Sequence, residues 1–200
     1  MKMTPPKGMN DILPDEMRLR DRVQGTILST YRRYGFVRID TPALEDAENL
    51  ARSEGGDNLG LVYQVLRRGD KLQAALESGE ALWDLGLRYD LTLPLARFYA
   101  CHRAELPAPF KSIQMGRAYR AERPQKGRLR EFIQCDIDIL GSESPFAERE
   151  LIAVTAEALL ALGFEGFTLH LNDRRVLRAL LDALGFGRED HGPALIALDK

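Results

Sequence analysis

Two stretches of alternating residues flank a short turn in the middle of the chain. Residues 110–120 alternate between larger apolar side chains and small or polar ones, and residues 132–140 repeat the alternation. A period of two is typical of a β-strand whose two faces meet different surroundings. Residues 121–129 lie between the two stretches and contain a proline and a glycine. The pattern predicts a long antiparallel hairpin.

The segments around this hairpin show helical or extended patterns. Apolar residues recur at near-helical spacing over 15–34, before Gly35, and Ser144-Pro145 is a suitable N-cap and first turn for a later helix. Residues 46–80 are mixed, and we expect a loop-rich insertion there with one or two short helices. Together these segments predict an α+β fold with an antiparallel sheet flanked by helices. Outside the hairpin and the insertion, the predicted elements are a helix over 15–34, a strand over 36–39 ended by Thr41-Pro42, a strand over 87–92, a helix from Pro94 that carries His102, a helix over 145–162 before Gly163, a strand over 167–171, and a helix from Asn172 or Asp173 to Leu184.

Charge and cysteine content exclude several classes of protein. The 28 basic and 30 acidic residues give a net charge of −2, which argues against a globally basic nucleic-acid coat. Cys101 and Cys135 are 34 positions apart and form no CxxC pair, which favours a reducing compartment over a disulfide framework or a zinc site. The N-terminal residues have no apolar targeting core, and no apolar run approaches the roughly 20 residues of a spanning helix. We therefore expect a cytoplasmic protein with no membrane contact.

Basic side chains are concentrated around the turn of the hairpin. Six basic residues and one acid, Glu122, give residues 117–130 a local charge of +5, whereas the rest of the chain carries −7. Because an arginine fork pairs bidentately with phosphate oxygens, this segment fits a grip for a polyanionic ligand. A solvated charged loop without a ligand is the alternative, and the pattern leaves it open. The six basic residues are Arg117, Arg120, Arg123, Lys126, Arg128 and Arg130.

One face of the second strand carries an aromatic ring followed by hydrogen-bond acceptors. Phe132 directly follows the basic loop, where its ring could stack on a nucleobase. Carboxylates on the same face suit a cationic ligand or one that bears N–H groups. A surface strand that exposes these groups to water is the alternative. The acceptors on this strand are Gln134, Asp136 and Asp138, and the strand expected over 87–92 adds Asp90 and Thr92.

Other chemistries find little support in the sequence. The phosphate-binding loop, the dinucleotide fingerprint, the nucleophile elbow and the zinc-protease motif are all absent. The three histidines, His102, His170 and His191, are isolated from one another, and we expect structural or surface roles for them. No metal site is expected.

Four segments carry recognisable motifs: PKGMNDILP (6–14), the predicted helix over 15–34 and strand over 36–39 together with Thr41–Glu45, LRYDLTLPLAR (87–97) and YRAERPQKGRLREFIQCDIDILG (119–141). Together they resemble the N-terminal half of the catalytic domain of the class II histidyl-tRNA synthetases. In order, they are similar to the family's N-terminal signature, to class II motif 1, to the histidine-binding strand, and to motif 2 with its loop. The last match is the most specific, because it runs over 23 continuous positions.

The resemblance implies an ATP site formed by four residues. Arg120 would be the catalytic residue, contacting both the α-phosphate of ATP and the carboxylate of the amino acid. Glu122 would lie at the adenine end of the nucleotide, and Arg128 would reach the γ-phosphate. Phe132 would stack on the adenine ring. ATP would be bound together with Mg²⁺, in the bent geometry of class II enzymes.

The resemblance also implies a histidine site and a reaction. Asp90, Thr92 and Gln134 would hold the α-amino group of L-histidine, and Asp138 would face the imidazole. The histidine carboxylate would attack the α-phosphorus of ATP to give histidyl-adenylate and pyrophosphate, and histidine would then pass to the terminal ribose of tRNA(His). Motif 1 implies a homodimer formed through that region.

The later elements of the family do not follow in this sequence. These are a histidine-specific segment with a second catalytic arginine, motif 3 with its ATP-binding arginine, and the C-terminal anticodon-binding domain. Residues 193–200 form an apolar-periodic stretch with no cap at its end, which is typical of an interrupted helix. We therefore expect residues 1–200 to be the N-terminal part of a catalytic domain, inactive in aminoacylation alone.

Two other functions are compatible with parts of the pattern. One is a histidine-binding regulatory subunit of ATP phosphoribosyltransferase, a paralogue of the synthetases that would have little reason to keep the ATP-binding set. The other is a non-catalytic RNA-binding module that uses the basic loop, which would show salt-dependent RNA binding without histidine or ATP. The complete ATP-binding set disfavours the first, and the net charge of −2 disfavours the second.

Overall fold

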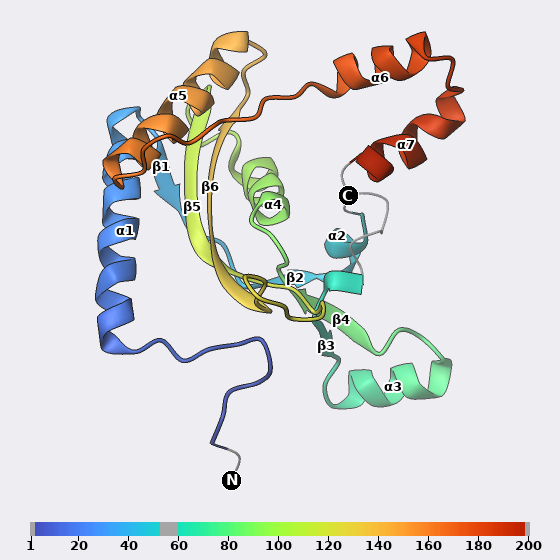
Figure 1. The fold of residues 1–200 in the computed structure, drawn as a ribbon. Helices are drawn as coiled ribbons and strands as arrows, with labels where there is room; N and C mark the ends of the chain where they lie inside the picture. Colours follow the sequence, from blue (N-terminus) through green and yellow to red (C-terminus); the bar gives the residue numbers. More distant parts are fainter. Residues whose placement is uncertain (1–2, 53–59, 199–200) are drawn as a thin grey trace. The chain divides into compact units, whose positions relative to one another are not determined.

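The computed structural model describes residues 3–52 and 60–198, which fall into two compact units (Figure 1). Unit 1 is Met1–Gly163 and unit 2 is Phe164–Lys200. The insertion expected over 46–80 lies in unit 1, and its residues 53–59 are outside the described part of the chain.

Unit 1 begins with a long helix, as predicted, and ends with another. Pro14 occupies the first position of helix α1, where a missing N–H costs nothing, and Asp15 and Glu16 lie favourably in the first turn. The Ser144 hydroxyl caps α5 by accepting a hydrogen bond from the Phe146 N–H at 3.3 Å. In chain order, the elements of unit 1 are α1 (Pro14–Arg33), β1 (Val37–Ile39), β2 (Leu44–Asp46), α2 (Ala47–Arg52), β3 (Gln64–Leu66), α3 (Asp70–Ser78), β4 (Trp83–Leu87), α4 (Thr92–His102), β5 (Phe110–Tyr119), β6 (Glu131–Leu140) and α5 (Pro145–Ala161).

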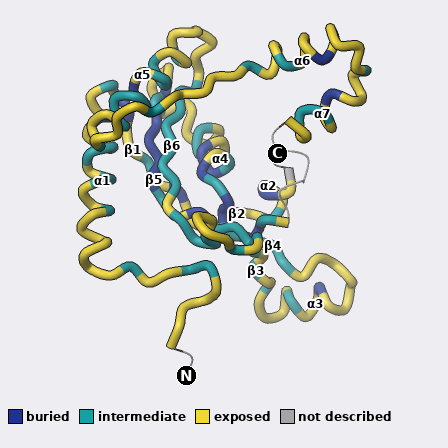
Figure 2. The backbone as a smooth tube through the Cα atoms, viewed as in Figure 1, coloured by how far each residue is buried: buried dark blue, intermediate teal, exposed yellow. Residues whose placement is uncertain are grey.

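The predicted hairpin is confirmed as β5 and β6, and it forms most of the first sheet. The two strands pair antiparallel over ten residues, from Phe110 opposite Leu140 to Tyr119 opposite Glu131. The sheet order is β1-β5-β6, so β5 is central and β6 is an edge strand. Figure 2 shows the consequence, since β5 is mostly buried whereas β6 is half-buried along its length.

The first sheet contains the predicted antiparallel pair and also one parallel pair that the sequence did not predict. Strand β1 pairs with β5 in parallel, with Val37 opposite Ser112 and Ile39 opposite Gln114. A parallel pair requires a long crossover, and here the chain passes through the second sheet and α4 before it returns as β5. Residue alternation reports which face a side chain occupies, but it carries no information on strand direction.

Helices α1 and α5 cover one face of this sheet, whereas α4 packs near its other face (Figure 1). Ile113 is fully buried at the centre of the first interface, against Tyr31 of α1 and Val154 of α5. On the opposite face, Phe110 stacks against Tyr99 of α4 with ring centroids 6.2 Å apart. The apolar core therefore lies mainly between the sheet and the pair α1–α5.

The second sheet has the order β2-β4-β3, with both pairs antiparallel. The strand predicted over 87–92 is wrong in position, because β4 is Trp83–Leu87 and helix α4 begins at Thr92. Asp90 explains the difference. Its carboxylate accepts a hydrogen bond from the Leu93 N–H at 3.3 Å, which favours a helix start over an extended strand.

Unit 2 consists of α6 (Arg174–Ala183), the short 3₁₀ helix η2 (Arg188–Asp190) and α7 (His191–Leu198). The predicted cap is confirmed, since the Asp173 carboxylate accepts a hydrogen bond from the Arg175 N–H at 2.8 Å. The strand predicted over 167–171 is wrong: these residues form no strand and Leu171 is 69% exposed. Three alternating apolar residues do not make a strand where no neighbouring strand supplies hydrogen bonds.

No helix among the described residues is both long and apolar enough to cross a membrane.

Candidate active site

The register of the hairpin places the predicted polar residues of β6 on one face. Side chains that lie directly opposite in an antiparallel pair share a face. This face, called the open face below, is lined by Phe132, Gln134, Asp136 and Asp138 of β6, opposite Ala118, Gly116, Gln114 and Ser112 of β5.

Arg88 fixes the backbone segment that borders the open face. Its side chain is buried and donates hydrogen bonds to the Thr41 carbonyl at 2.6 Å and to the Arg117 carbonyl at 2.8 Å. Gly116 leaves room for the guanidinium, since a Cβ there would lie only 2.5 Å from Nη2 of Arg88. The segment between β4 and α4, which carries Asp90, is therefore tied to the C-terminal end of β5.

Arg120 lies at the start of the basic loop, next to the segment between β4 and α4. Its Nε donates to the Tyr89 carbonyl at 3.2 Å, and its guanidinium carbon is 5.1 Å from the centre of the Phe132 ring. Both contacts restrict the arginine while leaving it half-exposed. The predicted catalytic residue and the predicted stacking ring are thus brought together.

Three carboxylates of the open-face region are desolvated. Burial raises the pKa of Asp138 to about 6, and the nearby charge of Asp136 adds to this shift. Burial also raises the pKa of Asp136, opposed by a hydrogen bond from Gln134. For Asp90, burial again raises the pKa, while backbone hydrogen bonds and the Arg120 charge oppose the shift. The region therefore favours a ligand that brings positive charge or N–H donors.

Several acceptors on this face have no partner among the described residues. The amide of Gln134 donates through Nε2 to Oδ2 of Asp136 at 2.8 Å, but its Oε1 is buried without a partner. Oδ2 of Asp138 is also buried and unpartnered, and so is the Ser112 hydroxyl opposite it. Buried polar atoms are rarely left unsatisfied, so their concentration on one face marks a place where a ligand would supply the missing bonds.

The basic loop is tied down at its base and exposed at its tip. The Arg130 Nε donates to the Glu122 carbonyl at 2.9 Å, and the Arg130 N–H donates to the Gly8 carbonyl at 2.7 Å. Arg128 at the tip is 67% exposed, and its Nη1 lies 3.8 Å from Oε2 of Glu122. Glu122 and Arg128 are therefore near each other, and the exposed guanidinium is free to turn toward an anion.

Comparison with known proteins identifies the family. The family model described as histidyl-tRNA synthetase matches residues 8–200. The chain belongs to the histidyl-tRNA synthetase family. It is 52% identical to a histidine–tRNA ligase of Leifsonia xyli subsp. xyli over an alignment of 203 positions, which covers 99% of this chain and 47% of that protein. It is 47% identical to a probable histidine–tRNA ligase of Tropheryma whipplei over 200 residues, which are 100% of this chain and 47% of that protein.

A solved structure supports the same assignment. The crystal structure of histidyl-tRNA synthetase from Nostoc sp. PCC 7120 is 29% identical, with a TM-score of 0.81, and the match covers 100% of this chain and 44% of that one. The likeness confirms the predicted fold as that of the histidyl-tRNA synthetase catalytic region. The chain spans just under half the length of the relatives it matches.

Within this histidyl-tRNA synthetase fold, the structure brings only some of the predicted site residues into contact or onto one face. The residues of β6 share the open face, and Arg120 contacts Phe132. Thr92 is exposed at the start of α4, and its N–H is directed to the Asp90 carboxylate. The sequence placed Asp136 among the acceptors for a cationic or N–H-bearing ligand, but the family resemblance assigned no role to Asp136 or Arg88. The alternation over 132–140 already placed Asp136 on the polar face, whereas no pattern indicated that Arg88 would be buried.

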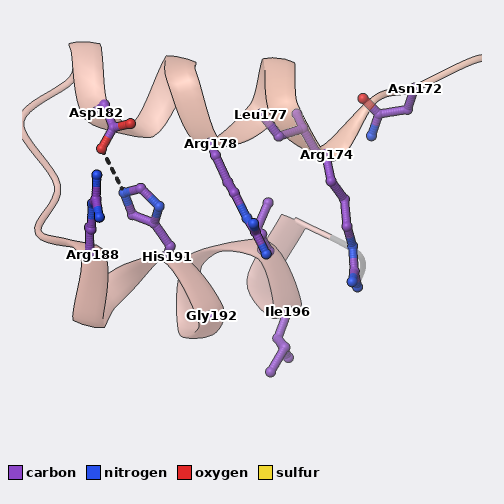
Figure 3. A pocket seen from close by; sticks show the side chains of 10 residues that line it. Asn172, Arg174, Leu177, Arg178, Asp182, Arg188, His191, Gly192 and Ile196 are labelled. Atoms are coloured by element: carbon purple, nitrogen blue, oxygen red, sulfur yellow. Dashed lines mark ion pairs between the residues drawn. The ribbon is translucent and has the colours of Figure 1, made fainter. Parts of the chain in front are cut away.

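Two cavities lie apart from the acceptors of the open face. One, of about 660 Å³, lies between the N-terminal residues and the start of β6 and is lined by Met9, Arg117 and Phe132, among others. The other, of about 860 Å³, belongs to unit 2 alone (Figure 3). There Arg174 and Arg178 point from α6 toward α7, and His191 faces Asp182 with 3.3 Å between Nε2 and Oδ1. Neither cavity contains the predicted histidine-binding residues.

Proposed function

We propose that this chain provides the part of a histidine–tRNA ligase that binds ATP and L-histidine and joins them. The observation that carries the proposal is the open face, where an arginine stacked on an aromatic ring borders a group of buried acceptors without partners. The names of the relatives, histidine–tRNA ligases at 52% and 47% identity, favour the same ligands.

The ATP end of the proposed site is the start of the hairpin loop. Phe132 offers a ring face for the adenine, and Glu122 offers an acceptor to the adenine amino group. Arg120 would contact the α-phosphate, and the exposed Arg128 would reach the γ-phosphate. Mg²⁺ would enter with ATP, since it prefers oxygen ligands and is commonly held by phosphate oxygens and water.

The histidine end of the proposed site is the group of acceptors along β6 and at the start of α4. Asp90, Thr92 and Gln134 would hold the α-ammonium group, and Asp138 would accept a hydrogen bond from the imidazole. Acceptors without partners suit a ligand rich in N–H groups, and they penalise an isostere that lacks them.

The proposed reaction needs positioning and charge neutralisation rather than a protein nucleophile. An oxygen of the histidine carboxylate attacks the α-phosphorus, and the bond to the β-phosphate oxygen breaks, so that pyrophosphate leaves with the electron pair. Arg120 neutralises negative charge that builds on the α-phosphate in this step. Histidine would then pass from histidyl-adenylate to the terminal ribose of tRNA(His).

We further propose a cytoplasmic homodimer. Cys101 and Cys135 are both free thiols, which fits a reducing compartment. The last residues of motif 1, Thr41–Glu45, lead into β2, an edge strand, where Leu44 is 44% exposed. An exposed edge and apolar side chains there suit a contact with a second copy.

Histidine-dependent ATP–pyrophosphate exchange by the full-length gene product tests the proposal. We expect exchange with histidine, background with the other amino acids, and no exchange without Mg²⁺. Residues 1–200 alone should stay near background, because the basic loop neutralises only one side of a triphosphate. A full-length protein that binds histidine but never exchanges pyrophosphate would instead favour the regulatory paralogue. RNA binding that depends on salt but not on histidine or ATP would favour the RNA-binding module.

A further inference from the structure

Two glutamine amides on the open face differ in how fully they are hydrogen-bonded. Gln114 of β5 donates through Nε2 to the Leu91 carbonyl at 2.8 Å, and its Oε1 accepts from the Thr41 hydroxyl at 3.4 Å. Gln134 of β6 donates to Asp136 at 2.8 Å, whereas its Oε1 is buried and has no partner within the described residues 3–52 and 60–198. Both ends of the Gln114 amide thus have a partner within the fold, whereas the carbonyl end of the Gln134 amide is left for a ligand.

Asp136 decides which half of the Gln134 amide is left. An ionised carboxylate only accepts hydrogen bonds, so the side of the amide that faces it must be the NH₂ group. The carbonyl oxygen then faces away from Asp136 and remains open. Without Asp136, the amide could turn and offer N–H groups instead, which would repel an ammonium ion.

We propose that Asp136 is a positioning residue of the histidine site: it holds the Gln134 amide so that Oε1 accepts a hydrogen bond from the α-ammonium group of the substrate. The proposal rests on the function proposed above, in which histidine occupies the open face. Asp136 itself acts through Gln134 and need not touch the substrate.

A purely structural role for Asp136 fits the surroundings poorly. Its charge raises the pKa of both Asp90 and Asp138, so the three carboxylates disfavour one another in the ionised state. No ion pair of Asp136 occurs among the described residues. Removing this carboxylate relieves repulsion, which offsets the loss of its hydrogen bond with Gln134, so the net change in stability should be small.

The test compares Asp136→Ala with Asp136→Asn in the full-length protein, with exchange kinetics as the readout. For Asp136→Ala we expect the KM for histidine to rise about tenfold, with the KM for ATP and kcat within about twofold of the parent. Asp136→Asn should recover most of the affinity, because its carbonyl still accepts the Gln134 N–H. Glu131→Gln is the control, since Glu131 lies on the other face of β6, paired with Arg117.

Two further measurements separate positioning from other effects. If Asp136 acts through Gln134, then Gln134→Ala combined with Asp136→Ala should be no worse for histidine than Gln134→Ala alone. 3-(Imidazol-4-yl)propionate, which lacks the α-amino group, should inhibit the parent and Asp136→Ala equally. Thermal unfolding of each variant shows whether it is folded. If Asp136→Ala does not fold, Asp136→Leu replaces it in the test, because leucine has nearly the size of aspartate but no acceptor for the Gln134 N–H.

The outcomes distinguish this inference from the proposed function. A parent protein without histidine-dependent exchange overturns the proposed function and the inference with it. A parent that exchanges normally, with Asp136→Ala unchanged in its KM for histidine, overturns the inference alone. Additive effects of the Gln134 and Asp136 variants, or an equal loss for histidine and for the analogue, also overturn it.

Discussion

The two faces of the β5–β6 hairpin bury ionisable groups with opposite consequences. On the packed face, burial raises the pKa of Tyr31 to about 12 and that of Cys135 to about 11. Both groups are neutral at pH 7 in any case, so the shift costs no stability there. On the open face, burial raises the pKa of Asp138 to about 6, which penalises the charged form near neutral pH. One face therefore stabilises the fold, and the other gives up stability where a ligand is proposed to bind.

The hydrogen bonds show the same difference. Ile113 on the packed face is surrounded by apolar side chains of α1 and α5, and its own side chain has no polar atom that needs a hydrogen-bond partner. On the open face, one oxygen each of Ser112, Gln134 and Asp138 is buried without a partner in the part of the chain that the structure describes. An unsatisfied buried polar atom costs about 1–3 kcal/mol, so three of them on one face are a substantial penalty that ligand binding would remove.

The largest expected effect is a loss of catalytic activity in a variant that keeps its fold. Arg120→Ala should lower histidine-dependent exchange in the full-length protein by about 10²- to 10³-fold, because a donor to the α-phosphate is lost. Arg149→Ala is a matched control, since Arg149 stacks on Phe146 at 5.3 Å, much as Arg120 stacks on Phe132 at 5.1 Å, but lies on α5. Exchange by Arg120→Ala within about twofold of the parent would remove the catalytic assignment.

The second prediction concerns a variant that loses stability but keeps its KM for histidine. Ile113→Ala should reduce the free energy of unfolding by about 3 kcal/mol, because it leaves a cavity in the packed core. Ile133 on the same face is 37% exposed, so Ile133→Ala should cost less than about 1 kcal/mol. Urea unfolding measures both, and the KM for histidine of the folded variants should change little. Equal costs at the two positions would mean that the packed face is not the core of the unit.

The difference between the two faces also explains how much the sequence predicted. Alternation along 110–120 and 132–140, with a turn between, gave the hairpin and its two faces, and local caps such as Ser144 gave the helices. Alternation failed over 167–171, which pair with no strand among the described residues, and over 87–92, where Asp90 starts a helix instead. Such local patterns contain no information about long-range pairing, and so the parallel pairing of β1 with β5 was missed.

The site was predictable to a similar extent. The side chains of β6 fall on one face because strand geometry requires it, and the structure confirms this placement. The internal bonds of the site were not predictable, since the contact between Arg120 and Tyr89 joins residues 31 positions apart. The same holds for Arg88, whose burial depends on the space that Gly116 leaves.

A smaller effect is expected when one acceptor of the open face is altered. Asp138→Asn should weaken histidine binding about tenfold, because the amide keeps the shape of the side chain but loses a charge-assisted hydrogen bond. ATP binding should stay nearly unchanged. Isothermal titration of the full-length protein with each ligand separately measures both affinities. Similar losses for the two ligands would assign Asp138 a structural role.

The smallest expected effect concerns pH and follows from the raised pKa of Asp138. A carboxyl with a folded pKa of about 6, above its ordinary value, holds its proton more tightly in the folded than in the unfolded state. The free energy of unfolding should therefore fall as pH rises from about 4 to above 6, and the penalty should be fully present above pH 6. Asp138→Asn lacks this titration and should exceed the parent in stability by about 1 kcal/mol at pH 7.5, with the gap closing by pH 4. Urea unfolding of both proteins at several pH values measures the gap. A gap that does not depend on pH would show that Asp138 keeps an ordinary pKa, and the contrast between the two faces would then rest on hydrogen bonding alone.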